Sequence, residues 1–176
     1  RIFTWNLQLN DYWCLQRGAI QMRTSDGSLK LVGLHDASSF TGNADDSVRN
    51  RNNWIGSVYY DIVKTTYNGK DFYTLIGFDN NSAMSNKKWI EVLTFDERGE
   101  PVFGGKYFSF EKDSLKRPTQ YRFSLEYKKE ARAILKYDED SKLIIVDHLI
   151  SETDEPQKKW TYVPDGDYEA FKWQNG

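Results

Sequence analysis

Residues 121–128 read Tyr-Arg-Phe-Ser-Leu-Glu-Tyr-Lys, an unbroken alternation of apolar and polar side chains. Successive side chains of an extended strand project to opposite faces, so this period of two is typical of a strand with one face in the core and the other in water. We therefore expect the four apolar residues, from Tyr121 to Tyr127, on a buried face. The four polar residues, from Arg122 to Lys128, are expected in solvent.

The same period recurs along the chain. Residues 2–9 place Phe3, Trp5 and Leu7 on one parity and polar residues on the other, again predicting a strand with its apolar side buried. Several runs are apolar on both parities and indicate central strands: residues 58–63, 72–78, 89–95 and 143–150. Further strands are predicted over residues 18–23, 29–34, 107–110, 132–137, 160–163 and 168–173.

Turn residues punctuate these runs. Asp26-Gly27 and Asn68-Gly69 are strong hairpin signals, and longer turns are predicted at residues 96–99, 138–141 and 164–166. These connections are too short for parallel crossovers, which need a dozen or more residues. The sequence therefore predicts an all-β, antiparallel meander of about ten to twelve strands, forming a sandwich or a partly open barrel. A closed up-and-down barrel is the alternative, and a partial propeller ranks below it.

The chain has 176 residues, which predicts one β-rich domain over residues 1–176. Residues 36–53 are rich in Ser, Asn, Asp and Gly and predict a long surface loop. The sequence opens directly in a predicted strand and ends at a turn-like Gln-Asn-Gly. We therefore expect it to be a trimmed or processed portion of a longer protein.

Composition narrows the classes of function. The net charge of −2 gives no overall field for nucleic acid or an anionic membrane. One Cys and two His exclude a disulfide framework and a zinc site built from those residues alone. No apolar run approaches the roughly 18 residues of a membrane span, so no transmembrane segment is expected. We also expect no cofactor. The six Trp, eleven Tyr and ten Phe are expected to fill most of the core.

Three segments carry a family resemblance. They contain YYDIVKTTYNGKDFYTLIGFDNN within residues 54–104, RFSLEYKKEARAILKYDEDSKLIIVDHL over 122–149, and YVPDGDYEAFKWQNG over 162–176. Together they resemble a family of uncharacterised exported proteins of the Bacteroidota, in particular its C-terminal β-rich part. The resemblance implies export to the periplasm or the outer membrane, and it carries over no reaction and no catalytic residue.

The resemblance leads us to expect a non-enzymatic interaction or structural domain with a protein partner. It would be an accessory part of a cell-envelope assembly such as a secretion or gliding machinery. The alternative is a carbohydrate- or lipid-binding module that uses exposed aromatic side chains. Five residues are candidates for contact with a partner or ligand: Trp160, Tyr162, Trp54, Tyr12 and Trp13. Trp160 and Tyr162 are two apart on one predicted strand and are expected to share a face.

Catalytic chemistry has few candidates. Asp147 and His148 are neighbours on a predicted strand, so their side chains point to opposite faces and cannot form a dyad. His148 is expected to be packed and hydrogen-bonded, and Cys14 to be structural. His35 lies at a strand end beside the long loop, where a functional role is easier to accommodate.

Carboxylates provide the remaining possibilities. Asp61 and Glu91 interrupt mostly apolar strands and are the best pair for a hydrolase, which needs two carboxyl groups about 5–10 Å apart across one cleft. Acidic turns at residues 138–140 and 165–169 carry oxygen ligands at calcium-like spacing but do not match the EF-hand frame. We expect these turns to be solvated, with no bound metal.

Overall fold

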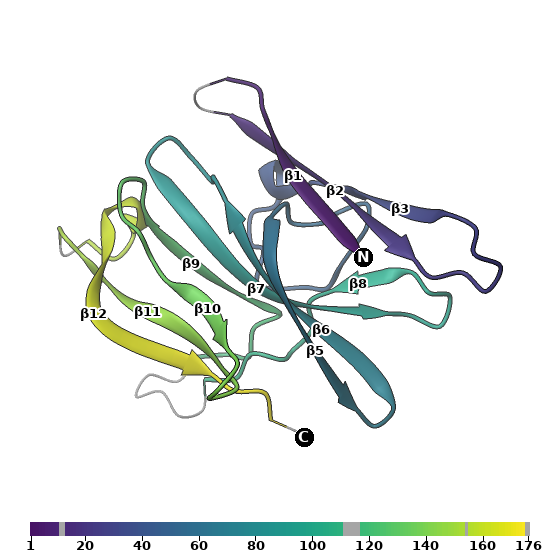
Figure 1. Ribbon diagram of the computed structural model, residues 1–176. Helices are drawn as coiled ribbons and strands as arrows, with labels where there is room; N and C mark the ends of the chain where they lie inside the picture. The colour runs from purple at the N-terminus through teal and green to yellow at the C-terminus, as the bar shows by residue number, and fades with distance from the viewer. Residues whose placement is uncertain (11–12, 111–116, 154, 175–176) are drawn as a thin grey trace.

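The fold is all-β. Figure 1 shows the computed structural model, which describes residues 1–10, 13–110, 117–153 and 155–174. Two short 3-10 helices, η1 (Ser38–Phe40) and η2 (Lys159–Thr161), interrupt the strands, and the described residues contain no α-helix. The strands are β1 (Ile2–Gln8), β2 (Cys14–Met22), β3 (Lys30–His35), β4 (Arg49–Asn50), β5 (Val58–Tyr67), β6 (Lys70–Asp79), β7 (Ser85–Phe95), β8 (Pro101–Phe103), β9 (Arg122–Lys128), β10 (Leu135–Asp138), β11 (Leu143–Ser151) and β12 (Tyr162–Phe171).

The strands form three antiparallel sheets. A six-stranded central sheet has the order β4-β8-β7-β6-β5, and β9 also pairs with β7. One three-stranded sheet is β1-β2-β3, and the other is β10-β11-β12. Most neighbours in space are also neighbours in sequence, so the predicted antiparallel meander is confirmed. None of the sheets, over the residues described, closes into a barrel.

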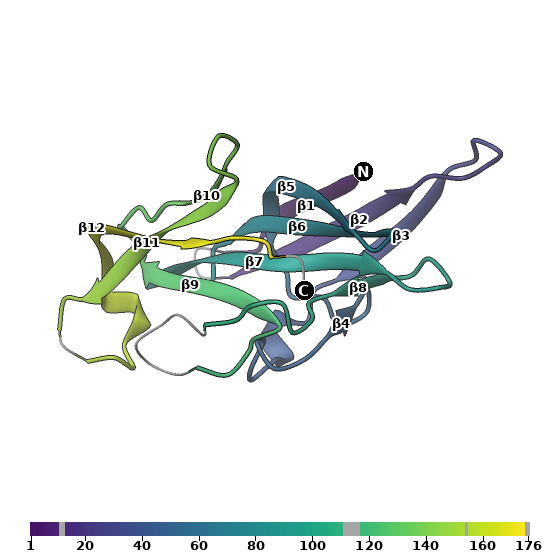
Figure 2. The same cartoon turned by 90° about the horizontal axis from the view of Figure 1, so that it is seen from below.

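The three sheets stack as layers. The β1–β3 sheet lies on one side of the central sheet and the β10–β12 sheet on the other (Figures 1 and 2). Each outer sheet is tied to β5 by a hydrogen bond. The backbone amide of Tyr59 donates to the Thr4 hydroxyl at 2.8 Å, and the Tyr60 hydroxyl donates to the Leu135 carbonyl at 2.7 Å.

The alternation of the central strands divides the core in two. On one face Ile76, Ile90 and Phe123 pack with the β10–β12 sheet, and on the other Leu75 and Leu93 pack with the β1–β3 sheet. Both faces of the central sheet are therefore covered. This explains why β6 and β7 read as apolar on both parities.

Two turn predictions have opposite outcomes. Asn68 and Gly69 both have positive φ, 49° and 72°, and link β5 to β6 in the two-residue hairpin that the sequence predicts. The turn predicted at residues 164–166 is wrong, because these residues lie inside one continuous strand, β12, where two strands were expected. β12 is an edge strand, which tolerates Pro164, and the register shift opposite His148 accommodates Gly166 at φ 98°.

Residues 107–110 were expected to form a strand, but only a single bridge, Phe108 to Gln120, forms there. Phe108 and Phe110 instead contribute their rings to the core against Phe171. Among the described residues, no helix has the length and apolar character needed to cross a membrane.

Candidate functional site

A buried ion pair joins β7 and β9. Glu91 and Arg122 face each other in the strand register, and their side chains are 2% and 0% exposed. The Arg122 Nε donates to Glu91 Oε2 at 3.2 Å. Arg122 belongs to the polar parity of residues 121–128, which the sequence predicts in solvent. That prediction is wrong for Arg122, because the β1–β3 layer and the long loop cover this face of the central sheet.

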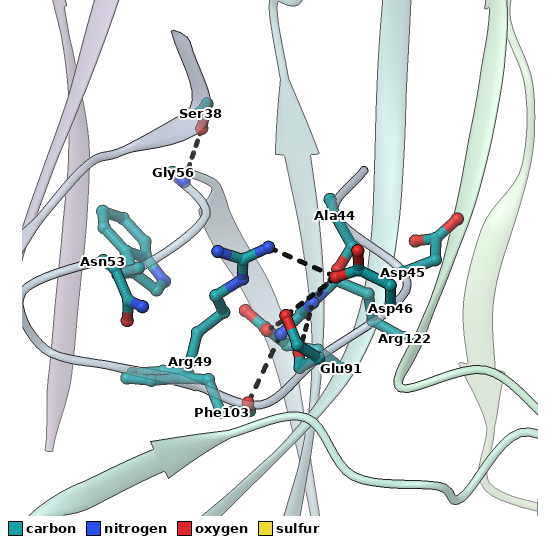
Figure 3. Close-up of polar contacts among 12 residues, drawn as sticks. Ser38, Ala44, Asp45, Asp46, Arg49, Asn53, Gly56, Glu91, Phe103 and Arg122 are labelled. Atoms are coloured by element: carbon teal, nitrogen blue, oxygen red, sulfur yellow. Dashed lines mark hydrogen bonds and ion pairs between the residues drawn. The ribbon is translucent and has the colours of Figure 1, made fainter. Parts of the chain in front are cut away.

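Arg122 also holds the long loop, residues 36–53. Its Nη1 donates to the carbonyl oxygens of Ala44 and Ser47, the latter at 3.1 Å, and its Nη2 donates to the Phe103 carbonyl at 3.3 Å (Figure 3). The Cβ of an alanine at Gly104 would lie 2.8 Å from Nη2, so the backbone there approaches the guanidinium as only glycine allows.

Two aromatic residues complete this network. The Tyr59 hydroxyl donates to Glu91 Oε1, and the Trp54 indole N–H donates to the Tyr59 hydroxyl at 2.7 Å. Burial raises the pKa of Tyr59 well above its usual value, and the Glu91 charge adds to that shift. Burial also raises the pKa of Glu91, while the Arg122 guanidinium opposes the shift. The charged groups are all engaged with one another, so we assign this network a structural role.

Glu91 and Asp61 are not brought together. In the sheet register Asp61 lies opposite Ile76, whereas Glu91 lies opposite Leu75, so the two carboxylates project from opposite faces of the central sheet. Asp61 accepts a hydrogen bond from the backbone amide of Ile62. The geometry that a hydrolase requires of this pair is absent.

The two histidines are separate. His148 does not contact Asp147, as the strand geometry predicts, but its Nδ1 lies 2.8 Å from Asp165 Oδ2 on the neighbouring strand β12. This hydrogen bond raises the pKa of His148. The pKa of Asp165 is lowered, first by its hydrogen bond from the Asp167 amide and second by the one to His148. Asp147 is buried and accepts from the Ile134 amide at 2.6 Å. His35 is exposed at the end of β3.

The acidic turns make internal hydrogen bonds. Asp138 accepts from the Ser141 hydroxyl and amide, which lowers its pKa. No group of three or more potential metal ligands comes together within the described parts of the chain.

The aromatic candidates do not form one platform. Trp54 is 0% exposed and packs between the central and β1–β3 sheets, so its predicted role in contacting a partner is wrong. Trp160 lies in η2 rather than on the strand of Tyr162, and the expected shared face does not exist. Lys159 Nζ lies 4.2 Å from the centre of the Tyr162 ring and covers it. Tyr12 lies outside the described residues, and Trp13 is 52% exposed.

The β1–β3 sheet exposes an apolar face that the sequence places in the core. Its outer face is defined here by Phe3, Trp5, Leu7, Arg17 and Leu31, which share one parity in the strand register. The four apolar residues are 47–55% exposed. Of the polar parity of β1, Thr4 turns inward and bonds to β5, whereas Asn6 and Gln8 are exposed. The expectation that the apolar side of residues 2–9 is buried is therefore wrong in this structure.

A polar cavity of about 160 Å³ lies where the β1–β3 sheet meets the central sheet. Three chain segments line it: the start of β2 with Trp13, the segment after β3 with Asp36, and the end of β6 with Asp79 and Asn80. The sequence singled out Trp13 but did not predict that Asp36 and Asp79 meet. The available signal was weak, consisting of an acidic residue at the end of each predicted strand.

Gln16 joins the two carboxylates of this cavity. Its side-chain amide donates to Asp79 Oδ1 at 2.7 Å, and its backbone amide donates to Asp36 Oδ2 at 3.3 Å. Asp36 Oδ1 also accepts from the Ser38 amide and hydroxyl and from the Gly56 amide. Burial raises the pKa of Asp79, and the backbone amide of Asn81 opposes that shift. The two carboxylates therefore occupy different environments on one wall.

Cys14 lines the same cavity, and Lys129 contacts Asn80 of its wall. Burial raises the pKa of the Cys14 thiol, and the charges of Asp79 and Asp36 add to the shift. The thiol is therefore not activated as a nucleophile. Lys129 Nζ donates to the backbone carbonyl and side-chain oxygen of Asn80, which fixes that side chain at the wall.

Comparisons with models of known families, with curated proteins and with solved structures found no match to this chain. The resemblance to exported Bacteroidota proteins stays a prediction.

Proposed function

We propose that this chain is a non-enzymatic interaction domain that binds a protein partner through the outer face of its β1–β3 sheet. The single observation that carries the proposal is the reversed polarity of β1. Its apolar parity, Phe3, Trp5 and Leu7, is 47–50% exposed, while its polar residue Thr4 faces the protein. Contiguous exposed apolar surface of this kind marks interaction sites in soluble proteins.

The composition of the outer face favours a protein as its partner. Trp5 lies directly opposite Arg17 in the register, and Arg17 lies opposite His35 on β3. Tryptophan and arginine are enriched among the few residues that contribute most of the binding energy in protein interfaces. β1 is also an edge strand, whose free backbone groups can pair with a strand of the partner.

The cellular setting forms part of the proposal. The family resemblance supports an exported domain at the periplasmic or outer-membrane side, acting as an accessory in an envelope assembly such as a secretion or gliding machinery. The alternative is a carbohydrate- or lipid-binding module that uses exposed aromatic side chains, of which Trp13 and Trp160 are 52% and 38% exposed.

Site-specific photocrosslinking tests the outer face. The photoreactive residue p-benzoylphenylalanine would replace Trp5, Leu31 or, as a control, Phe40, which is 91% exposed but belongs to η1 and not to the β1–β3 sheet. In envelope extract of the source cells, positions 5 and 31 should both crosslink to the same protein, and position 40 should not. Trp5→Ser should lower recovery of that protein by about tenfold or more, whereas Phe40→Ser should leave it unchanged.

Three results would overturn the proposal. The first is the absence of a crosslinked protein at positions 5 and 31, and the second is an equal crosslinking pattern at position 40. The third is a crosslink only to a second copy of this chain, which would indicate self-association and not an envelope partner.

A further inference from the structure

We infer that the polar cavity at the junction of the β1–β3 and central sheets binds a single neutral sugar ring. This inference is independent of the outer face and of the protein partner proposed above. It rests on the chemistry of the cavity wall, on the aromatic residue that lines the cavity and on its size.

The wall offers both hydrogen-bond acceptors and donors. The carboxylates of Asp36 and Asp79 supply acceptors, and the hydroxyl of Ser39 and the amide of Asn80 can both accept and donate. Lys129 binds the Asn80 side-chain oxygen at 2.5 Å, so the amide nitrogen of Asn80 is the end left for a ligand. Each hydroxyl of a sugar both donates and accepts, so it matches such a mixed wall better than a purely anionic or cationic group does.

An aromatic residue lines the cavity. It is Trp13, which is 52% exposed, so part of its side chain is open to solvent. The C–H groups on one side of a pyranose ring form an apolar surface that can stack on an aromatic face, while the hydroxyl groups point to the polar wall. A tryptophan beside two carboxylates therefore suits a ligand with one apolar and one polar side.

The wall is also pre-arranged. Asp36 is held by Ser38 and Gly56, and Asp79 is held by Gln16 and the Asn81 amide. Because these groups are fixed before a ligand arrives, binding does not have to order them.

Size and charge restrict the ligand. A volume of about 160 Å³ lies below the roughly 300–1,000 Å³ of pockets for drug-sized molecules, so a single ring is the largest occupant expected. The two carboxylates disfavour an anionic ligand such as a uronic acid. Lys129 does not offset this, because its ammonium group is engaged by the carbonyls of Asn80 and Ser82.

Ligand-observed saturation-transfer NMR on the full chain tests the inference. The probes are the methyl pyranosides of glucose, galactose, mannose and N-acetylglucosamine, with methyl glucuronide and glucosamine as charged comparisons. At least one neutral glycoside should bind at millimolar concentration, and methyl glucuronide should not. Trp13→Ala and Asp79→Asn should each weaken binding by about tenfold or more.

Two control variants keep the result interpretable. Trp160→Ala removes a partly exposed tryptophan elsewhere, and Trp5→Ser disrupts the outer face; both should bind the glycoside as the wild type does. Trp13→Ala changes a half-exposed side chain, so it keeps the test valid if Asp79→Asn fails to fold. Binding that survives Trp13→Ala would overturn the assignment. So would binding of no neutral glycoside, of methyl glucuronide alone, or of glucosamine alone through its ammonium group.

Discussion

Replacing Glu91 by glutamine should destabilise the protein by about 3 kcal/mol, because it leaves the Arg122 charge buried without its counter-ion. Removing one member of a buried ion pair costs roughly 3–5 kcal/mol. Glu91 and Arg122 are 2% and 0% exposed, so water cannot take over the lost contact. The value lies at the lower end because glutamine keeps the size of glutamate and an oxygen that can accept from Tyr59.

Urea denaturation followed by circular dichroism measures this change. With a slope of about 2 kcal/mol per molar urea, a loss of about 3 kcal/mol lowers the unfolding midpoint by about 1.5 M. Asp71→Asn is the matched control, because it removes a carboxylate from the exposed Lys64–Asp71 pair on the β5–β6 hairpin. Exposed pairs contribute little, so this control should leave the midpoint nearly unchanged.

The double variant Glu91→Leu with Arg122→Met separates the pair from its surroundings. It removes both buried charges, so its cost should fall below the sum of the two single substitutions. It should stay less stable than the wild type, because the carbonyls of Ala44, Ser47 and Phe103 lose their donor. A midpoint for Glu91→Gln equal to that of Asp71→Asn, or strictly additive costs, would refute this account.

Two further predictions concern a glycine and a histidine. In Gly56→Ala, the new Cβ would lie 2.5 Å from the Asp36 carboxyl carbon, so we expect the free energy of unfolding to fall by about 1–3 kcal/mol. Thermal denaturation measures this change. Gly33→Ala is the control and should be nearly neutral, because its new Cβ would have no atom within 4 Å. The pKa of His148, followed by NMR, should exceed 6.5 and fall towards that value in Asp165→Asn. Because the folded-state pKa is raised, this hydrogen bond stabilises the fold below pH 6.5 and its contribution is lost as the pH rises through the folded-state value. An unchanged titration in Asp165→Asn would exclude that bond.

The sequence predicted the antiparallel meander because the information for strands and hairpins is local. In residues 121–128, Phe123, Leu125 and Tyr127 are buried as their parity predicts. The burial of Arg122 could not be predicted from the same pattern. The alternation of one strand shows which parity is apolar. It does not show that a second layer covers the polar side, as the β1–β3 sheet does on the central sheet.

The opposite error occurs in β1. Phe3 and Trp5 alternate with polar residues as a half-buried strand should, yet the apolar side is the exposed one. Thr4 turns inward because it lies opposite Gly18 in the register, on the face of the β1–β3 sheet that also carries Ile20, Val32 and Leu34. Those three residues are 2–4% exposed and pack on the central sheet. The inward face of β1 is therefore set by the strands it pairs with, which leave no trace in its own local pattern.

The candidate site was only partly predictable for the same reason. Trp13 was identified from its place in a connection, where an aromatic residue is often exposed. Asp36 and Asp79 meet only because the β1–β3 sheet packs on the central sheet, with Gln16 between them. Trp54 follows a polar loop and was expected to be exposed, but its indole N–H binds Tyr59 in the interior.

The anchoring of the long loop by Arg122 has a consequence for folding during synthesis. The Arg122 guanidinium and the Ala44 carbonyl that it binds are separated by 78 residues in the sequence. At a translation rate of about 5–20 residues per second, the ribosome needs about 4–16 s to deliver Arg122 after Ala44 has been made. Throughout that interval the loop lacks the guanidinium that binds its carbonyl oxygens, and it is open to proteases. Glu91 is also synthesised before its counter-ion. Completion of β9 is therefore the step that lets the nascent chain close the half of its core between the central and β1–β3 sheets.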